Sequence, residues 1–192
     1  FLNYKELSLN IKKPYLVISQ HPVVTEVFSY LEQIKITYEA IRNFDIQKVW
    51  LLPNLDAGYD SANQFLENEF IKKDLHINVI SSLPLDLYSI LLKHSSCLIG
   101  NSSSAIYEAP SFKLPSVNIG SRQDGRVHGN NIVNVKKVLT KEIIKKIKFA
   151  LKMNKKQIIN PFIKKNPEEI VIKILKKEKF SKILPKKFFD LK

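Results

Sequence analysis

Cysteine is almost absent from this sequence, which has Cys97 as its single thiol in 192 residues. One thiol excludes a disulfide framework, so the fold has to rest on an apolar core, and we expect a reducing, cytoplasmic location. Hydrophobic residues make up 44% of the chain, which is ordinary for a globular protein and excludes disorder. Because Cys97 lies in the apolar run 96–99, we expect a buried thiol and not a nucleophile.

Long hydrophobic runs are also missing. No segment approaches the roughly 18 apolar residues of a membrane-spanning helix, and the first 20 residues lack the basic-then-apolar order of a signal peptide. The chain starts with Phe1 and not with Met. We therefore expect a fragment whose missing N-terminal part could carry a targeting signal, and we expect no membrane partner.

Acidic residues are scarce only in the C-terminal third of the chain. Residues 1–130 hold 12 Lys and Arg against 13 Asp and Glu, whereas residues 131–192 hold 19 against 5, so the net charge of +13 comes from the second segment. Its lysines lack the interleaved Arg and Gly of many RNA-binding tails and come in pairs, at 136–137, 145–146, 155–156, 164–165, 176–177 and 186–187. We interpret them as solvated helix faces, with nucleic acid or an acidic membrane surface as the alternative.

Small hydroxyl residues are concentrated in one turn, 101–104, between the apolar run 96–99 and apolar residues at helical spacing. In the first turn of a helix, backbone N–H groups lack partners and attract anions, and serine hydroxyls add donors. We therefore predict a phosphate site at this turn. Glu108, two turns into the predicted helix, is placed to accept hydrogen bonds from ribose hydroxyls. The alternative is that Ser102 or Ser103 only caps the helix.

Strand and helix patterns alternate along the first 135 residues. Short apolar runs, most of them followed by a polar turn and a helical pattern, occur at 15–19, 48–52, 77–80, 96–99, 116–119 and 131–135. Strands joined by helical crossovers form a parallel sheet that helices cover on both faces. The predicted fold class is therefore α/β, with a Rossmann-like parallel sheet. We assign residues 1–139 to this lobe and residues 140–192 to C-terminal helices and a Lys-rich tail of the same domain, with a helix capped by Asn166.

Polar residues follow five of the predicted strands. These clusters are Ser19 to Pro22, Pro53 to Gly58, Ser81 to Pro84, Asn101 to Ser104 and Gly120 to Arg126. The carboxyl ends of parallel strands meet at one edge of the sheet, which is where open α/β sheets bind ligands. We therefore expect the clusters to converge, which favours phosphate binding at the serine turn over simple capping.

Four motifs, in this order, resemble the UDP-N-acetylglucosamine 2-epimerase family, which has the GT-B fold. They are Gln20-His21-Pro22-Val23, Pro53-Asn54-Leu55-Asp56-Ala57-Gly58, Ile99-Gly100-Asn101-Ser102-Ser103-Ser104 with Glu108, and the segment 115–126 with Arg122-Gln123-Asp124-Gly125-Arg126. The Asn-Ser-Ser turn and the Arg-Gln-Asp-Gly-Arg loop are similar to the hydrolysing branch, whereas the non-hydrolysing branch usually has Asp-Ser-Gly-Gly. Residues 105–107 depart from the family, which usually has Gly or Cys-Gly there.

The resemblance implies the C-terminal lobe of a GT-B fold that holds the UDP part of UDP-N-acetylglucosamine. It implies a catalytic His21 that stabilises the leaving diphosphate, with serines on the diphosphate, Glu108 on the ribose and arginines that neutralise phosphate or tether their loop. The residues implied in UDP binding are Asn54, Ser102, Ser103, Ser104, Glu108, Arg122 and Arg126. Neither a cofactor nor a metal is implied, because the remaining histidines match no motif and lack ligand spacing.

The family reaction eliminates UDP across C1 and C2 of the sugar to give a glycal, and water then adds to give N-acetylmannosamine for sialic-acid-type sugars. Elimination needs a base for the C2 proton and stabilisation of the departing UDP. In the family the acid and base carboxylates lie in the N-terminal lobe, and we expect that lobe to be missing from this chain. The implied partners are therefore a UDP-sugar and that missing lobe, and a homo-oligomer stays open.

Two alternative functions stay open at this point. One is the C-terminal lobe of a GT-B glycosyltransferase, which would also bind a nucleotide sugar; the Arg-Gln-Asp-Gly-Arg loop argues against it. The other is a non-enzymatic protein that binds nucleic acid through the basic tail. Within the recognised family, a different UDP-sugar such as a diacetamido sugar is a further alternative.

Overall fold

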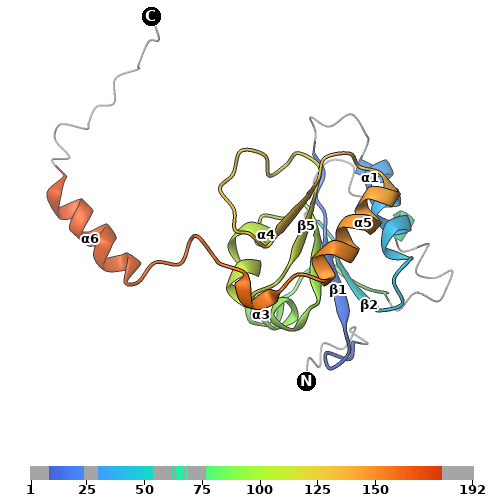
Figure 1. The fold of residues 1–192 in the computed structure, drawn as a ribbon, viewed down its shortest axis with the longest axis horizontal. Helices are drawn as coiled ribbons and strands as arrows, with labels where there is room; N and C mark the ends of the chain where they lie inside the picture. The colour runs from blue at the N-terminus through green and yellow to red at the C-terminus, as the bar shows by residue number, and fades with distance from the viewer. Residues whose placement is uncertain are drawn as a thin grey trace, which may run out of the picture. The chain divides into compact units, whose positions relative to one another are not determined.

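The computed structural model describes residues 9–23, 30–53, 62, 64–66, 68 and 77–178. The chain divides into two compact units, Phe1–Pro161 and Phe162–Lys192. The first unit contains one parallel sheet with the strand order β3-β2-β1-β4-β5-β6, and Figure 1 labels its strands β1, β2 and β5. Its strands are β1 Tyr15–Ser19, β2 Gln47–Leu51, β3 Ile77–Ile80, β4 Cys97–Gly100, β5 Ser116–Ile119 and β6 Ile132–Val135. The predicted Rossmann-like parallel sheet is confirmed.

The strand order reverses between β1 and β4. From β1 the chain moves outward through β2 to β3, and it then returns to place β4 on the other side of β1. The two strands pair in parallel, with Ser19 opposite Gly100 at their carboxyl ends. Because the loops that leave the two strands diverge to opposite sides, this is the point where an open α/β sheet forms its ligand crevice.

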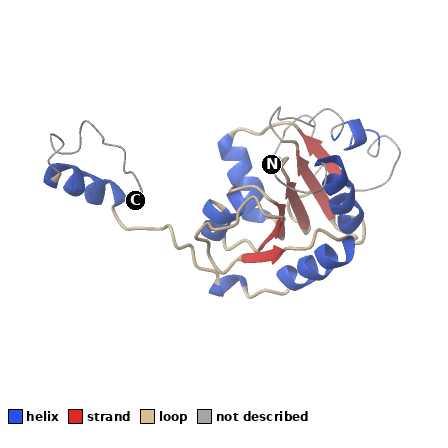
Figure 2. Cartoon of the chain, turned by 90° about the horizontal axis from the view of Figure 1, so that it is seen from above, coloured by secondary structure: helices blue, strands red, loops and turns tan. Residues whose placement is uncertain are grey.

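Helices cover both faces of the sheet because its central strands are apolar on both sides. Along β1, Leu16 and Ile18 belong to the core under α1 Tyr30–Ile41 and α5 Thr140–Leu151, which also pack on each other. Tyr15 and Val17 belong to the core under α3 Leu85–His94, α4 Ser104–Tyr107 and the 3-10 helix η1 Ala109–Phe112. Figure 2 shows the sheet between these two helical layers, and buried apolar surface of this kind is the main stabilising term.

The helix after β4 is shorter than the sequence pattern predicts. α4 makes a single turn, and η1 follows it directly after Glu108. Pro110 explains the change, because it has no N–H to donate to the carbonyl four residues earlier and the chain tightens into a 3-10 helix. Glu108 therefore lies at the end of one α-helical turn, and the prediction that placed it two turns into a longer helix was wrong.

The second unit contains α6 Pro167–Lys177, and the first also contains the short 3-10 helix η2 Lys155–Gln157. α6 starts with Pro167 and has acids in its first turn and lysines in its last, as the dipole favours. Asn166 does not cap it through its side chain, so that prediction was wrong: its φ of 50° is left-handed, whereas a capping side chain needs an extended backbone. The division into 1–139 and 140–192 stays a prediction.

Cys97 is buried at the start of β4, as predicted. Burial raises the pKa of the Cys97 thiol to about 12, although the backbone of Val117 and the charge of Lys155 act in the opposite direction. The side chain is therefore a neutral part of the core. Among the helices within the described part of the chain, none has the length and apolarity needed to cross a membrane.

Candidate functional site

Asn101 joins the loops that follow β4 and β1. Its side-chain Oδ1 accepts a hydrogen bond from the backbone N–H of His21 at 2.7 Å, and its Nδ2 donates to the carbonyl of His21 at 2.8 Å. The backbone N–H of Asn101 also donates to the carbonyl of Ser19 at 3.1 Å. Residues 80 positions apart in the sequence thus meet at the point where the strand order reverses.

The loop after β5 reaches the same residue. Arg122 Nη1 and Gln123 Nε2 both donate to the backbone carbonyl of Asn101, at 3.1 and 2.6 Å. A guanidinium carries five N–H donors, so this one bond leaves others for an anion. The structure therefore brings together the predicted residues His21 and Arg122 and the first residue of the serine turn.

The serine turn presents backbone donors at this edge of the sheet. Ser102 Oγ accepts a hydrogen bond from the backbone N–H of Ser104 at 3.3 Å, and the carbonyls of Ser102 and Ser103 accept the first bonds of α4. Within the described ranges, no hydrogen bond is made by the backbone N–H groups of Ser102 and Ser103. Two successive free N–H groups suit a phosphate oxygen. The capping alternative accounts for the Ser102 hydroxyl but not for these two donors.

Tyr88 of α3 lies beside the serine turn, a contact that sequence reasoning missed. Burial raises the pKa of Tyr88, the negative charge of Glu108 raises it further, and a hydrogen bond with the Ser104 side chain lowers it. Tyr88 is therefore close to both Ser104 and Glu108, which share one side of α4 because they are four residues apart. In the sequence, Tyr88 is part of an amphipathic helix pattern and carries no signal that separates it from a core aromatic residue.

Gln20 fixes the segment before His21 from the side of α1. Its side chain is fully buried, with Oε1 accepting from the Thr37 hydroxyl at 2.7 Å, and its backbone carbonyl accepts from the Tyr30 hydroxyl at 2.8 Å. His21 Nε2 lies 3.5 Å from Ser19 Oγ. The imidazole therefore projects from a backbone that is held from two sides, by α1 through Gln20 and by Asn101 directly.

Arg126 is placed differently from Arg122. It lines a cavity of about 360 Å³ together with His128, Lys136 and Asn118, and the lining includes none of the three serines. Asn118 is almost fully buried there and donates to the side chain of Asn134, which lines the same cavity. The loop 120–126 thus contributes Arg122 to the Asn101 cluster and Arg126 to this hollow, which Gln123 also lines.

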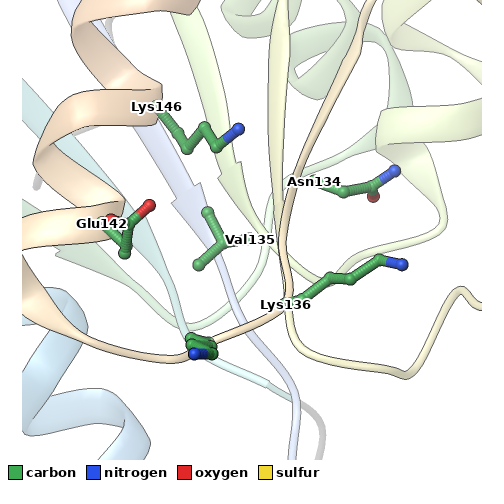
Figure 3. Close-up of a pocket in the computed structure, with 6 residues that line it drawn as sticks. Asn134, Val135, Lys136, Glu142 and Lys146 are labelled. Carbon is green, nitrogen blue, oxygen red and sulfur yellow. The ribbon is translucent and has the colours of Figure 1, made fainter.

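A second hollow of about 310 Å³ lies at the end of β6 and the first turns of α5. Figure 3 shows Lys146, Glu142 and Val135 on one side of the chain at the end of β6, with Asn134 and Lys136 on the other. Two of the lysine pairs in the sequence contribute to this basic surface. It contains none of the predicted site residues.

Asn54, which the sequence motif places on the UDP side of the crevice, lies outside the described residues. Within the described ranges, no group of three or more His, Cys, Asp or Glu could hold a metal ion.

Comparison with protein families gives one match over most of the chain. Residues 3–176 match the family described as UDP-N-acetylglucosamine 2-epimerase. The chain is 31% identical over 139 residues to GDP/UDP-N,N'-diacetylbacillosamine 2-epimerase (hydrolyzing) of Campylobacter jejuni, which covers 70% of this chain and 36% of that protein. It is 30% identical over 183 residues to polysialic acid biosynthesis protein P7 of Escherichia coli, which covers 91% of this chain and 46% of that protein. The chain spans less than half the length of both relatives.

Solved structures share the fold. The UDP-GlcNAc 2-epimerase of Methanocaldococcus jannaschii, in complex with UDP-GlcNAc and UDP, matches with a TM-score of 0.66 and 18% identity over 85% of this chain and 45% of that one. The UDP-GlcNAc 2-epimerase of Neisseria meningitidis, bound to UDP-GlcNAc, matches with a TM-score of 0.62 and 16% identity over 91% and 46%. At these identities the likeness concerns the fold alone.

Proposed function

Because the chain belongs to the UDP-N-acetylglucosamine 2-epimerase family, we propose that it forms the UDP-binding lobe of a hydrolysing 2-epimerase. The observation that carries the proposal is the cluster around Asn101. It joins the backbone of His21, the serine turn and Arg122 at the switch point of a parallel sheet, where such sheets bind nucleotides. Two N–H groups that make no hydrogen bond in the described part of the chain, together with serine hydroxyls and a guanidinium, match the oxygens of a diphosphate.

The roles follow from where each group lies. The N–H groups of Ser102 and Ser103, with the nearby hydroxyls, hold the diphosphate, and Arg122 neutralises its charge. His21, across from them on the β1 side, stabilises the negative charge that develops on UDP as the bond from C1 to oxygen breaks. Glu108 accepts hydrogen bonds from the ribose hydroxyls at the far end of α4. Asn54 and Arg126 are proposed as further contacts of the nucleotide or its loops.

The proposed reaction needs an acid and a base in addition to the UDP-binding groups named above. A base removes the C2 proton while UDP leaves from C1, and water then adds across the resulting double bond to give the free 2-epimeric sugar. We propose that the other half of the family's fold provides the acid and the base, and that the reaction takes place in the cytoplasm.

The sugar belongs to bacterial surface glycans in our proposal. Both curated relatives named above carry names from such syntheses, diacetylbacillosamine in one case and polysialic acid in the other. We therefore propose UDP-N-acetylglucosamine or its diacetamido counterpart as the substrate, with the free 2-epimer and UDP as products. The UDP-binding groups of this chain are common to both substrates, so they do not distinguish them.

The proposal is tested in two steps. Calorimetric titration of the chain should give saturable binding of UDP and weaker binding of UMP, which lacks one phosphate, and of ADP. In D₂O, a protein that contains both halves of the fold should convert UDP-N-acetylglucosamine to UDP and N-acetylmannosamine that carries deuterium at C2, because the C2 proton is removed and replaced. Transfer of the sugar to an acceptor would instead support a glycosyltransferase, and salt-sensitive binding of duplex DNA without UDP binding would support the nucleic-acid alternative.

A further inference from the structure

We propose that Asn101 is a positioning residue that fixes His21, the serine turn and Arg122 relative to one another before UDP binds. The inference deepens the proposed function and rests on it, because it concerns the same crevice. It adds a role that the motif comparison does not give: the first residue of the turn does not bind the nucleotide, and acts through its neighbours.

Every polar group of Asn101 is already used inside the protein. Its side chain bonds both backbone groups of His21, its N–H bonds the carbonyl of Ser19, and its carbonyl accepts from Arg122 and Gln123. The residue is fully buried. Each of its polar atoms therefore already has a partner in the protein, and it has no exposed surface for a ligand, which separates it from the partly exposed Ser103 and Ser104.

Asparagine has the chemistry that this position needs. One amide group offers an acceptor and a donor on the same carbon, and His21 presents a donor and an acceptor on its two backbone groups. Aspartate keeps the acceptor for the His21 N–H but places a second oxygen 2.8 Å from the His21 carbonyl, where two acceptors repel. Alanine loses both bonds.

The consequence for binding is preorganisation. His21 follows β1, the serines follow β4 and Arg122 follows β5, so their relative positions depend on three separate loops. Asn101 connects all three through hydrogen bonds of 2.6–3.1 Å. A ligand that finds these groups already in place does not have to supply the free energy of ordering them, so removing the connection should weaken UDP binding without removing any UDP contact.

Asn131 provides a matched control. It is also fully buried, and its Nδ2 makes three hydrogen bonds, to the carbonyls of Ala105 and Leu114 and to Ser116 Oγ. It directly precedes β6 and contacts the start of β5, and its bond to Ala105 reaches α4, but none of its hydrogen bonds in the described part of the chain goes to Asn101, His21, Arg122 or the three serines. Asn131→Ala should therefore cost stability in the same way as Asn101→Ala while leaving the hydrogen bonds of Asn101 unchanged.

The experiment compares Asn101→Ala, Asn101→Asp and Asn131→Ala in the full chain, at a temperature where thermal unfolding curves show all of them folded. Amide hydrogen exchange at His21, measured by NMR without ligand, should speed up at least about 10-fold in Asn101→Ala, because its N–H loses its acceptor, and stay near wild type in Asn101→Asp and Asn131→Ala. Calorimetric titration with UDP should show at least about 10-fold weaker binding in both Asn101 variants and less than about 3-fold in Asn131→Ala.

The two measurements separate the two proposals. Unchanged exchange at His21 in Asn101→Ala, or equal losses of UDP affinity in Asn101→Ala and Asn131→Ala, would overturn the positioning role. Absence of UDP binding by the wild-type chain would count against the proposed function, and the exchange rates would still decide whether Asn101 holds His21. If Asn101→Ala does not fold, Gln123→Met serves in its place, because it removes one of the two donors to the Asn101 carbonyl. This variant should weaken UDP binding by a smaller factor of about 3, and an unchanged UDP affinity of Gln123→Met would contradict the proposal.

Discussion

Gly100 on β4 and Ser19 on β1 approach each other so closely that a Cβ atom on Gly100 would lie 2.1 Å from the carbonyl oxygen of Ser19. The φ of Gly100 is +129°, which L-residues with a side chain rarely adopt. The same Ser19 carbonyl accepts the N–H of Asn101. The close approach therefore allows Asn101 to reach His21, and the glycine is required by both its conformation and the space around it.

Replacement of this glycine should be costly. We expect Gly100→Ala to lower the free energy of unfolding by about 3 kcal/mol or more, because strain and a backbone clash act together. Urea unfolding measures the change. Gly125→Ala is the control, because Gly125 also has a positive φ, +76°, but has no atom within 4 Å of the added Cβ; it should cost about 1 kcal/mol. Similar losses in the two variants would show that the approach of β1 and β4 is not tight.

The two arginines of the loop after β5 should differ in their effect on UDP affinity. Arg122 bonds the carbonyl of Asn101, whereas Arg126 lines a cavity that none of the three serines borders. We expect Arg122→Ala to weaken UDP binding about 10-fold or more and Arg126→Ala less than about 3-fold, in calorimetric titrations at one ionic strength. Each variant removes one positive charge from the same loop, so equal losses would mean that only net charge matters.

Glu108 should be responsible for recognition of the ribose. If its carboxylate accepts hydrogen bonds from ribose hydroxyls, the wild-type chain should bind UDP about 5- to 10-fold more tightly than 2'-deoxy-UDP, because one charge-assisted bond is lost. Glu108→Gln should reduce this preference to near 1 while binding both ligands more weakly. A preference that survives the substitution would assign the ribose to another residue.

Cys97 should make the protein less stable at alkaline pH. Burial raises the pKa of its thiol to about 12 in the folded chain, whereas an unfolded cysteine ionises near 8.5. Below the pKa of the unfolded cysteine, the thiol is neutral in both states, so its contribution to the free energy of unfolding does not change with pH. Above that pKa only the unfolded state ionises, and the free energy of unfolding falls by about 2 kcal/mol by pH 10. Urea unfolding at pH 8 and pH 10 measures this loss. In Cys97→Ala, the fall in the free energy of unfolding between these two pH values should be smaller by about 2 kcal/mol, because the thiol is gone. The native thiol should also resist Ellman's reagent until the chain unfolds.

Much of the fold could be predicted because periodicity marks buried strands directly. The runs at 15–19, 77–80 and 116–119 coincide with β1, β3 and β5. The predicted runs for β2 and β4 are shifted by one residue at both ends, and the run for β6 starts one residue early. The helix after β4 could not be predicted from spacing alone. Its apolar residues do recur at helical intervals, but Pro110 removes one hydrogen-bond donor and divides the segment into α4 and η1.

The site was predictable as a set of loops and less so as a set of contacts. The convergence of the clusters that contain the serine turn, His21 and Arg122 could be predicted because polar residues after parallel strands gather at one edge, and the resemblance to the family then singled out His21 and Arg122. The role of Asn101 at the centre of these contacts could not be predicted. Its hydrogen bonds join residues 80 and 22 positions apart, and an asparagine in a turn is ordinarily explained by the turn itself. Tyr88 was missed for a similar reason, since only the folded chain places it beside Ser104 and Glu108.

An NMR titration of the ¹⁵N-labelled chain with UDP tests the central claim most directly. The account predicts saturable chemical-shift changes that are largest for the backbone amides of Ser102 and Ser103, which make no hydrogen bond within the described part of the chain, and for His21 and Arg122 across the crevice. Shifts confined to the lysine-rich residues after 140, or no saturable shifts at the serine turn, would contradict it.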